Sequence, residues 1–172
     1  PEFHDHVGDT ATRDFDGAAG LHYANRSGRN DLIVMKVARD EQNITFHART
    51  RQPITPHTDP GWMWLLLETD GNTENGWNGY DYIVNRTVEE SQMTWLERCV
   101  GGWHWEKVAM VRYRVAGDQL HLAIPRSALR RTHDQKHLSL GFQWIDNSQH
   151  PGAIMDVYQS GDAAPEGRFM YR

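Results

Sequence analysis

The sequence has little of what marks several large protein classes. It contains one cysteine, Cys99, so no internal disulfide can form. The longest uninterrupted apolar run, from Trp62 to Leu67, has six residues, far fewer than the ~18 of a membrane-spanning helix. The 18 basic residues are outnumbered by 23 acidic ones, and no basic tract occurs. We therefore expect neither a disulfide scaffold nor a membrane or nucleic-acid partner.

Motifs of catalysis are also absent. There is no G-x-S-x-G elbow for a nucleophilic serine, no H-E-x-x-H pair and no Cys/His spacing typical of a zinc site. The spacing of the acidic residues singles out no carboxylate pair for glycoside hydrolysis. We expect a protein that is not an enzyme.

What the sequence does have is apolar alternation with a period of two. Between Asn43 and Thr50, Ile44, Phe46 and Ala48 share one face, and Gln119 to Ile124 repeats the pattern. The predicted strands cover 32–38, 43–50, 62–67, 80–85, 93–98, 108–115, 119–124, 138–145, 154–158 and 168–171. Only Pro125 to Arg131 resembles a helix. The pattern predicts one all-β domain over residues 1–172, a jelly-roll-like β-sandwich of about nine to ten strands.

A polar loop follows the apolar run 62–67. Its oxygen-bearing side chains include Glu68, Asp70, Asn72 and Asp81, and glycines ease the turns between them. Calcium takes six to eight such oxygens in a flexible geometry, although the spacing is not that of an EF-hand. The residues alone support two interpretations equally, a calcium site and a solvated loop without a metal.

A second acidic group lies nearer the start of the sequence. It contains Asp5, Asp9, Asp14, Asp16 and Asp31. Such a segment can wrap a cation or form a solvated arm, and the sequence favours the arm.

The seven tryptophans are unusual in so polar a chain. Trp62, Trp64 and Trp95 fall on apolar strand faces, which predicts core positions. Trp77 lies in the polar loop and Trp144 near the end of a strand, so we expect both indoles to be exposed. An exposed indole beside amides and carboxylates is a common platform for sugar rings. Trp103 and Trp105, which follow two glycines, are expected to pack with one face open.

Several segments resemble a known family. They are Asp31 to Thr50, Trp62-Met63, the run Gly76-Trp77-Asn78-Gly79-Tyr80-Asp81-Tyr82-Ile83-Val84-Asn85-Arg86, and the ending Gly161-Asp162-Ala163-Ala164-Pro165-Glu166-Gly167-Arg168-Phe169. The chain is similar to the family 9 carbohydrate-binding modules and the wider DOMON-like sandwiches. These modules are appended to large secreted bacterial proteins that resemble glycoside hydrolases.

The resemblance implies roles for particular residues. A glycan would bind between aromatic side chains, with Trp77 and Trp144 as stacking faces. The hydroxyl partners would be Gln143, Asp146, Asn147 and Arg86. Structural calcium would lie at Glu68 and Asp70 with Asn72. Here Glu68 stands where the family has aspartate, and Glu74-Asn75 replaces the usual Thr-Gly, so the ligand set differs from the family pattern.

The expected function is that of a non-catalytic module that holds an attached glycoside hydrolase on polysaccharide. Its partners would be the carbohydrate and an upstream catalytic domain on the same polypeptide. We expect a secreted protein whose signal peptide lies outside this C-terminal fragment. The alternative is a structural sandwich that packs on its own catalytic domain and binds no sugar. A DOMON-type haem protein is a third class, distinguished by a Soret band.

Overall fold

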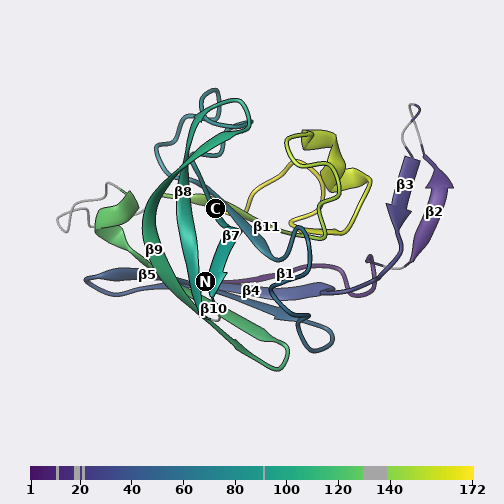
Figure 1. Ribbon diagram of the computed structural model, residues 1–172, viewed down its shortest axis with the longest axis horizontal. Helices are drawn as coiled ribbons and strands as arrows, with labels where there is room; N and C mark the ends of the chain where they lie inside the picture. Colours follow the sequence, from purple (N-terminus) through teal and green to yellow (C-terminus); the bar gives the residue numbers. More distant parts are fainter. Residues whose placement is uncertain (11, 18–19, 21, 91, 130–138) are drawn as a thin grey trace.

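The computed structural model describes residues 1–10, 12–17, 20, 22–90, 92–129 and 139–172. The fold is all-β and sandwich-like, as predicted, with one large curled antiparallel sheet of ten strands (Figure 1). Its strands, in spatial order, are β1 (Glu2–His4), β4 (Leu32–Arg39), β5 (Asn43–Thr50), β10 (Gln119–Pro125), β9 (His104–Ala116), β8 (Met93–Gly101), β7 (Tyr82–Glu90), β6 (Trp64–Glu68), β11 (Gly141–Asp146) and β12 (Asp162–Ala164). A separate hairpin pairs β2 (Arg13–Asp16) with β3 (His22–Asn25).

The curl brings the two edges of the large sheet together. The ring of Phe3 on β1 lies 5.2 Å from the ring of Phe142 on β11 and 4.7 Å from the ring of Tyr171. The backbone N–H of Leu32, at the start of β4, donates to Asp162 Oδ2 of β12 at 2.7 Å. We call this contact of β1 and β4 with β11 and β12 the seam. Side chains, rather than a ladder of backbone bonds, close the fold there.

The alternation read from the sequence is confirmed inside the curl. Ile44, Phe46 and Ala48 of β5 are fully buried, as are Leu120 and Leu122 of β10. They pack with residues of β4, β6, β7, β8, β9 and β11 in one central core. This core fills the interior between the two sides of the curled sheet.

Strand β6 is buried on both faces, as its unbroken apolar run predicts. Leu65 and Leu67 point into the central core. On the opposite face, Trp64 and Leu66 join a second cluster covered by the loop after β6 and by the C-terminal segment. Strands β6 and β11 thus lie in the middle of a layered structure rather than at its surface.

Some predicted elements differ from those in the structure. Residues 154–158 form a short 3-10 helix, η3 (Ile154–Tyr158), instead of a strand, because the Asp156 carboxylate accepts from the Ser148 hydroxyl and the Gln149 N–H and curls the chain. The range 168–171 contributes only an isolated bridge from Tyr171 to Phe142. The predicted helix is the 3-10 turn η2 (Arg126–Leu129). Residues 130 and 131 of that prediction, and residue 138 of the predicted strand 138–145, lie outside the described residues. Strands β1, β2, β3 and β12 were not predicted.

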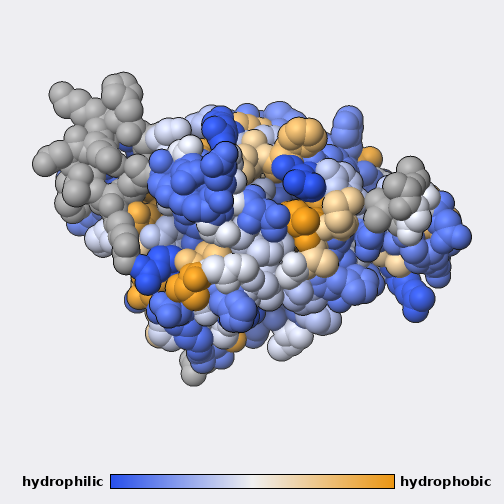
Figure 2. Space-filling view, turned by 90° about the horizontal axis from the view of Figure 1, so that it is seen from above, coloured by the Kyte–Doolittle hydropathy of each residue, from blue (hydrophilic) through white to orange (hydrophobic). Residues whose placement is uncertain are grey.

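On the face shown in Figure 2 the surface is mostly hydrophilic, with apolar residues in small separate patches. Within the described ranges, no helix has the length and apolar character needed to cross a membrane.

Candidate functional site

The two tryptophans expected at the surface are buried, so that expectation is wrong. Trp144 is 0 % exposed and Trp77 is 6 % exposed. Trp77 lies in a loop, but the loop folds back over β6 and packs the indole against Trp103, with 4.5 Å between ring centroids. Trp144 lies on β11 between β6 and β12 and points into the central core. Neither indole offers a face on which a sugar could stack.

The polar neighbours of Trp144 are occupied by the fold. Gln143 is fully buried; its Oε1 accepts from the Tyr80 hydroxyl at 2.8 Å, and its Nε2 donates to the carbonyls of Pro165 and Gly167. Gln143 therefore fixes the C-terminal segment against β11. These partners come from distant segments, so the pattern of residues around Gln143 does not indicate them.

Asp146 is likewise a fully buried structural group. Its Oδ2 accepts from Arg29 Nε at 2.9 Å, and its Oδ1 accepts from Asn30 Nδ2 at 3.0 Å and the Met63 N–H at 2.9 Å. Burial raises the pKa of Asp146, and the Arg29 charge and these hydrogen bonds oppose that effect. Asp146 therefore joins three segments of the chain.

The remaining two predicted sugar contacts have different partners in the fold. Asn147 adopts a left-handed conformation with φ of 58° and donates from Nδ2 to Ser27 Oγ at 3.3 Å. Arg86 lies on β7, where its guanidinium pairs with the fully buried Glu97 of β8. The structure therefore does not gather the six predicted ligand residues at one exposed surface.

The tryptophans nearest to solvent are Trp95, Trp103 and Trp105, which are half-buried. Trp103 and Trp105 flank the start of β9, with 5.4 Å between their ring centroids. This agrees with the expectation that one face of the pair stays open. Trp95 was placed in the core by the sequence, but its ring lies under the Lys107 ammonium at 4.7 Å on the outer side of the β8–β9 hairpin. That core assignment is wrong.

Three of the four predicted metal ligands come together. Glu68, Asp70 and Asp81 each place a carboxylate oxygen within 4.8 Å of the others. Burial raises the pKa of Asp81, and the neighbouring Asp70 and Glu68 raise it further. Asn72 serves its own loop instead, because its Oδ1 accepts from the Glu74 N–H at 3.0 Å. We call Glu68, Asp70 and Asp81 the loop cluster.

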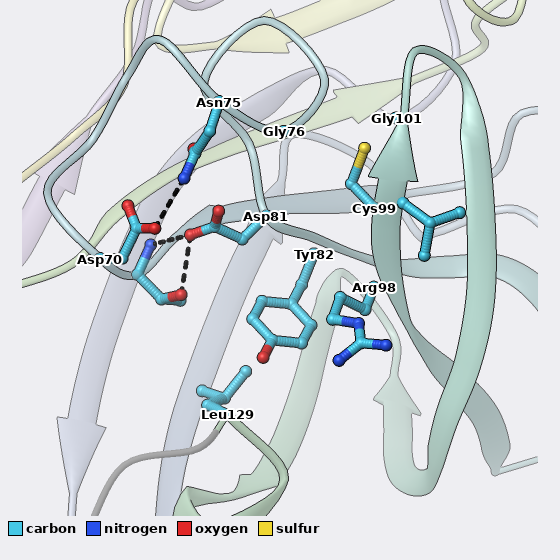
Figure 3. Close-up of a pocket in the computed structure, with 11 residues that line it drawn as sticks. Asp70, Asn75, Gly76, Asp81, Tyr82, Arg98, Cys99, Gly101 and Leu129 are labelled. Carbon is cyan, nitrogen blue, oxygen red and sulfur yellow. Dashed lines mark hydrogen bonds between the residues drawn. The ribbon is translucent and has the colours of Figure 1, made fainter.

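The loop cluster borders an open hollow of about 620 Å³ (Figure 3). Tyr82 and Arg98, from the adjacent strands β7 and β8, lie side by side in it and face the loop that carries Asp70 and Asp81. The Thr69 N–H and hydroxyl hold Asp81 Oδ2 at 2.7 and 2.8 Å. A second hollow along β9 shares Tyr82 and Arg98 with the first. The sequence singled out neither Arg98 nor Tyr82.

The N-terminal acidic group divides in two. Asp14 and Asp16 pair with His22 on the β2–β3 hairpin, each at 2.7 Å, and are exposed. Asp5 and Asp9 instead meet Asp162 of β12, with one carboxylate oxygen of each within 4.8 Å of the others. The expectation of a solvated arm therefore holds for the hairpin and is wrong for the residues at the seam.

Comparisons with known proteins returned no match for this chain. A scan against protein-family models found no matching family, a search of curated proteins no matching relative, and a search of solved structures no matching structure.

Proposed function

We propose that the chain is a non-catalytic carbohydrate-binding module, similar to family 9, with its sugar site in the hollow beside the loop cluster. The observation that carries the proposal is the lining of this hollow. Carboxylates of Asp70 and Asp81 lie on one side and the guanidinium of Arg98 on the other, around the edge of the Tyr82 ring. The site thus differs from the one around Trp144 that the sequence predicts.

The lining suits a ligand rich in hydroxyl groups. Each sugar hydroxyl both donates and accepts a hydrogen bond, so it can bridge a carboxylate, which only accepts, and a guanidinium, which only donates. The hollow continues toward Glu106 and Lys107, which would let further sugar units of a chain make contacts. A shallow polar site of this kind gives modest affinity, because many polar groups must lose water on binding.

Calcium is part of the proposal. Glu68, Asp70 and Asp81 supply hard carboxylate oxygens, the ligands that calcium prefers, and two of the three also line the hollow. An ion there would fix the loop that forms one wall of the sugar site. By the same resemblance, we propose that the module serves a secreted enzyme to which it is attached.

Replacing Arg98 with alanine is expected to lower the affinity for polysaccharide at least tenfold. Among the described residues, the Arg98 side chain makes a 3.4 Å ion pair with the exposed Glu106, so the loss of stability should stay below about 1 kcal/mol. Affinity gel electrophoresis against a polysaccharide panel, with calcium present, measures the first effect, and thermal unfolding measures the second. Arg114→Ala, an exposed arginine of β9 outside this hollow, is the matched control.

Two results would contradict this assignment. One is wild-type protein that binds no member of the panel in calcium, and the other is Arg98→Ala protein that binds as well as the wild type.

The alternative function, packing on an attached catalytic domain without binding sugar, is favoured by the burial of Trp62, Trp64, Trp77 and Trp144. It is also favoured by Val108 and Met110, which are two residues apart on β9 and so share a face of that strand. Their side chains are 41 % and 45 % exposed. Under this alternative, Met110→Glu should lower the melting temperature of a longer polypeptide that includes the neighbouring domain, but not that of the isolated module.

A further inference from the structure

Four aspartates from distant parts of the sequence meet at the seam. Asp5 follows β1, Asp9 lies in the next turn, Asp31 immediately precedes β4, and Asp162 opens β12. Carboxylate oxygens of Asp5, Asp9 and Asp162 lie within 4.8 Å of one another. The charge of Asp9 acts on Asp31, and the charge of Asp31 acts on Asp162. We call these four residues the seam cluster.

Several oxygens of the seam cluster are buried without a hydrogen-bond partner among the described residues. They are Oδ2 of Asp5, both carboxylate oxygens of Asp9, which lie against the carboxyl group of Glu166, another acid, and Oδ1 of Asp31. Asp31 is only 6 % exposed, so its unpaired Oδ1 lies in the protein interior. A buried acceptor that lacks a donor costs about 1–3 kcal/mol, and more when it is charged. Four such oxygens in one place call for a positive group.

The protein groups around the cluster supply little positive charge. The Gly8 N–H donates to Asp31 Oδ2 at 2.9 Å, and the Leu32 and Ala163 N–H groups donate to Asp162. The Arg51 guanidinium lies 3.8 Å from Asp31, but its side chain is 58 % exposed, so solvent screens much of its effect. The His6 N–H also donates to Asp5, and the charge of Arg13 acts on the neighbouring Glu166. Within the described part of the chain, four carboxylates thus share few donors.

We propose that the seam cluster binds a divalent cation of the calcium type, which ties β1 and β4 to β12 where the curled sheet closes. Carboxylate oxygens are hard ligands that suit Ca²⁺, and the converging group contains no histidine or cysteine that would favour a transition metal. Because the ligands come from near both ends of the sequence, the ion binds the folded chain and stabilises it.

The first test uses calcium, EDTA and two variants at pH 7.5. Calcium at about 100 times its Kd should raise the melting temperature of the wild type by about 5–10 °C. Asp9→Asn removes no hydrogen bond from an N–H or hydroxyl donor of the described residues and should abolish the seam's share of this shift. In EDTA the same variant should melt no lower than the wild type, because one of four like charges has been removed. Asp16→Asn, whose side chain is 92 % exposed on the β2–β3 hairpin, is the control and should behave as the wild type.

A second variant separates this site from the loop cluster. Asp70→Asn removes a carboxylate of the loop cluster, and Asp9→Asn removes one of the seam cluster, so calorimetric titration with CaCl₂ should show one site lost in each. If Asp9→Asn retains the full calcium shift and stoichiometry, the seam proposal is overturned. If Asp70→Asn retains both instead, calcium at the loop cluster is wrong and the seam proposal stands. If calcium neither binds nor stabilises the wild type, both fail.

Discussion

Trp144→Ala is expected to reduce the free energy of unfolding by about 3–5 kcal/mol, the range for removing a buried aromatic side chain. The indole is fully buried in the central core, on a strand with neighbours on both sides. The cavity left behind would be enclosed by β6, β11 and β12 and could collapse only in part. For a chain of this length the melting temperature should fall by roughly 6–20 °C.

Urea denaturation followed by fluorescence measures this effect. Trp144→Phe is the milder variant; Trp144 Nε1 has no hydrogen-bond partner among the described residues, so phenylalanine loses volume but no bond. Trp105→Ala, at a half-buried position, should cost less than half as much. If Trp144→Ala instead melted like the wild type and lost polysaccharide binding, Trp144 would be an exposed sugar platform, as the sequence predicts, and its burial would be refuted.

The contrast between Trp144 and Ile44 shows what the sequence can reveal about this fold. A strand with one face in the core has a clear alternation, and for Ile44, Phe46 and Ala48 that alternation gives the buried face directly. Strand β11 is covered on both faces, so its polar residues Gln143 and Asp146 are buried too. In the sequence, the polar residues near Trp144 are typical of an exposed strand end. In the structure, Gln143 and Asp146 are buried, and each bonds to partners elsewhere in the chain.

The N-terminal strands were missed for a related reason. Strand β1 has three residues and β2 has four, and neither carries an apolar alternation. Strand β1 forms because it pairs with β4 and inserts Phe3 against Phe142, which are tertiary contacts. The sequence therefore showed the acidic residues of this segment but not that the seam would bring Asp5 and Asp9 to Asp162.

The loop cluster was easier to predict because its three carboxylates lie within one short segment. Glu68 ends β6 and Asp81 immediately precedes β7, and these strands pair with each other, so the loop must bring its two ends together. The hollow beside it could not be predicted in the same way. Arg98 reaches it from β8, through a register that only the folded sheet defines.

Asp146→Asn is the second substitution with a large expected effect, a loss of about 3–5 kcal/mol of unfolding free energy. The carboxylate accepts from three donors, Arg29, Asn30 and the Met63 N–H. An asparagine of the same shape has one acceptor oxygen and one NH₂ donor, so at least one of these donors would face another donor. The Arg29 side chain is only 11 % exposed and would lose its buried partner.

A neighbouring aspartate provides the matched control. Asp59 also pairs with Arg29, at 3.2 Å, but its side chain is 36 % exposed, so Asp59→Asn should cost less than about 1 kcal/mol. Arg29→Met should be less damaging in the Asp146→Asn background than in the wild type, because the two groups act as one unit. If Asp146 were instead a sugar ligand at the surface, Asp146→Asn would leave the urea midpoint unchanged and weaken only polysaccharide binding. The two accounts of Asp146 thus predict opposite results in the same pair of measurements.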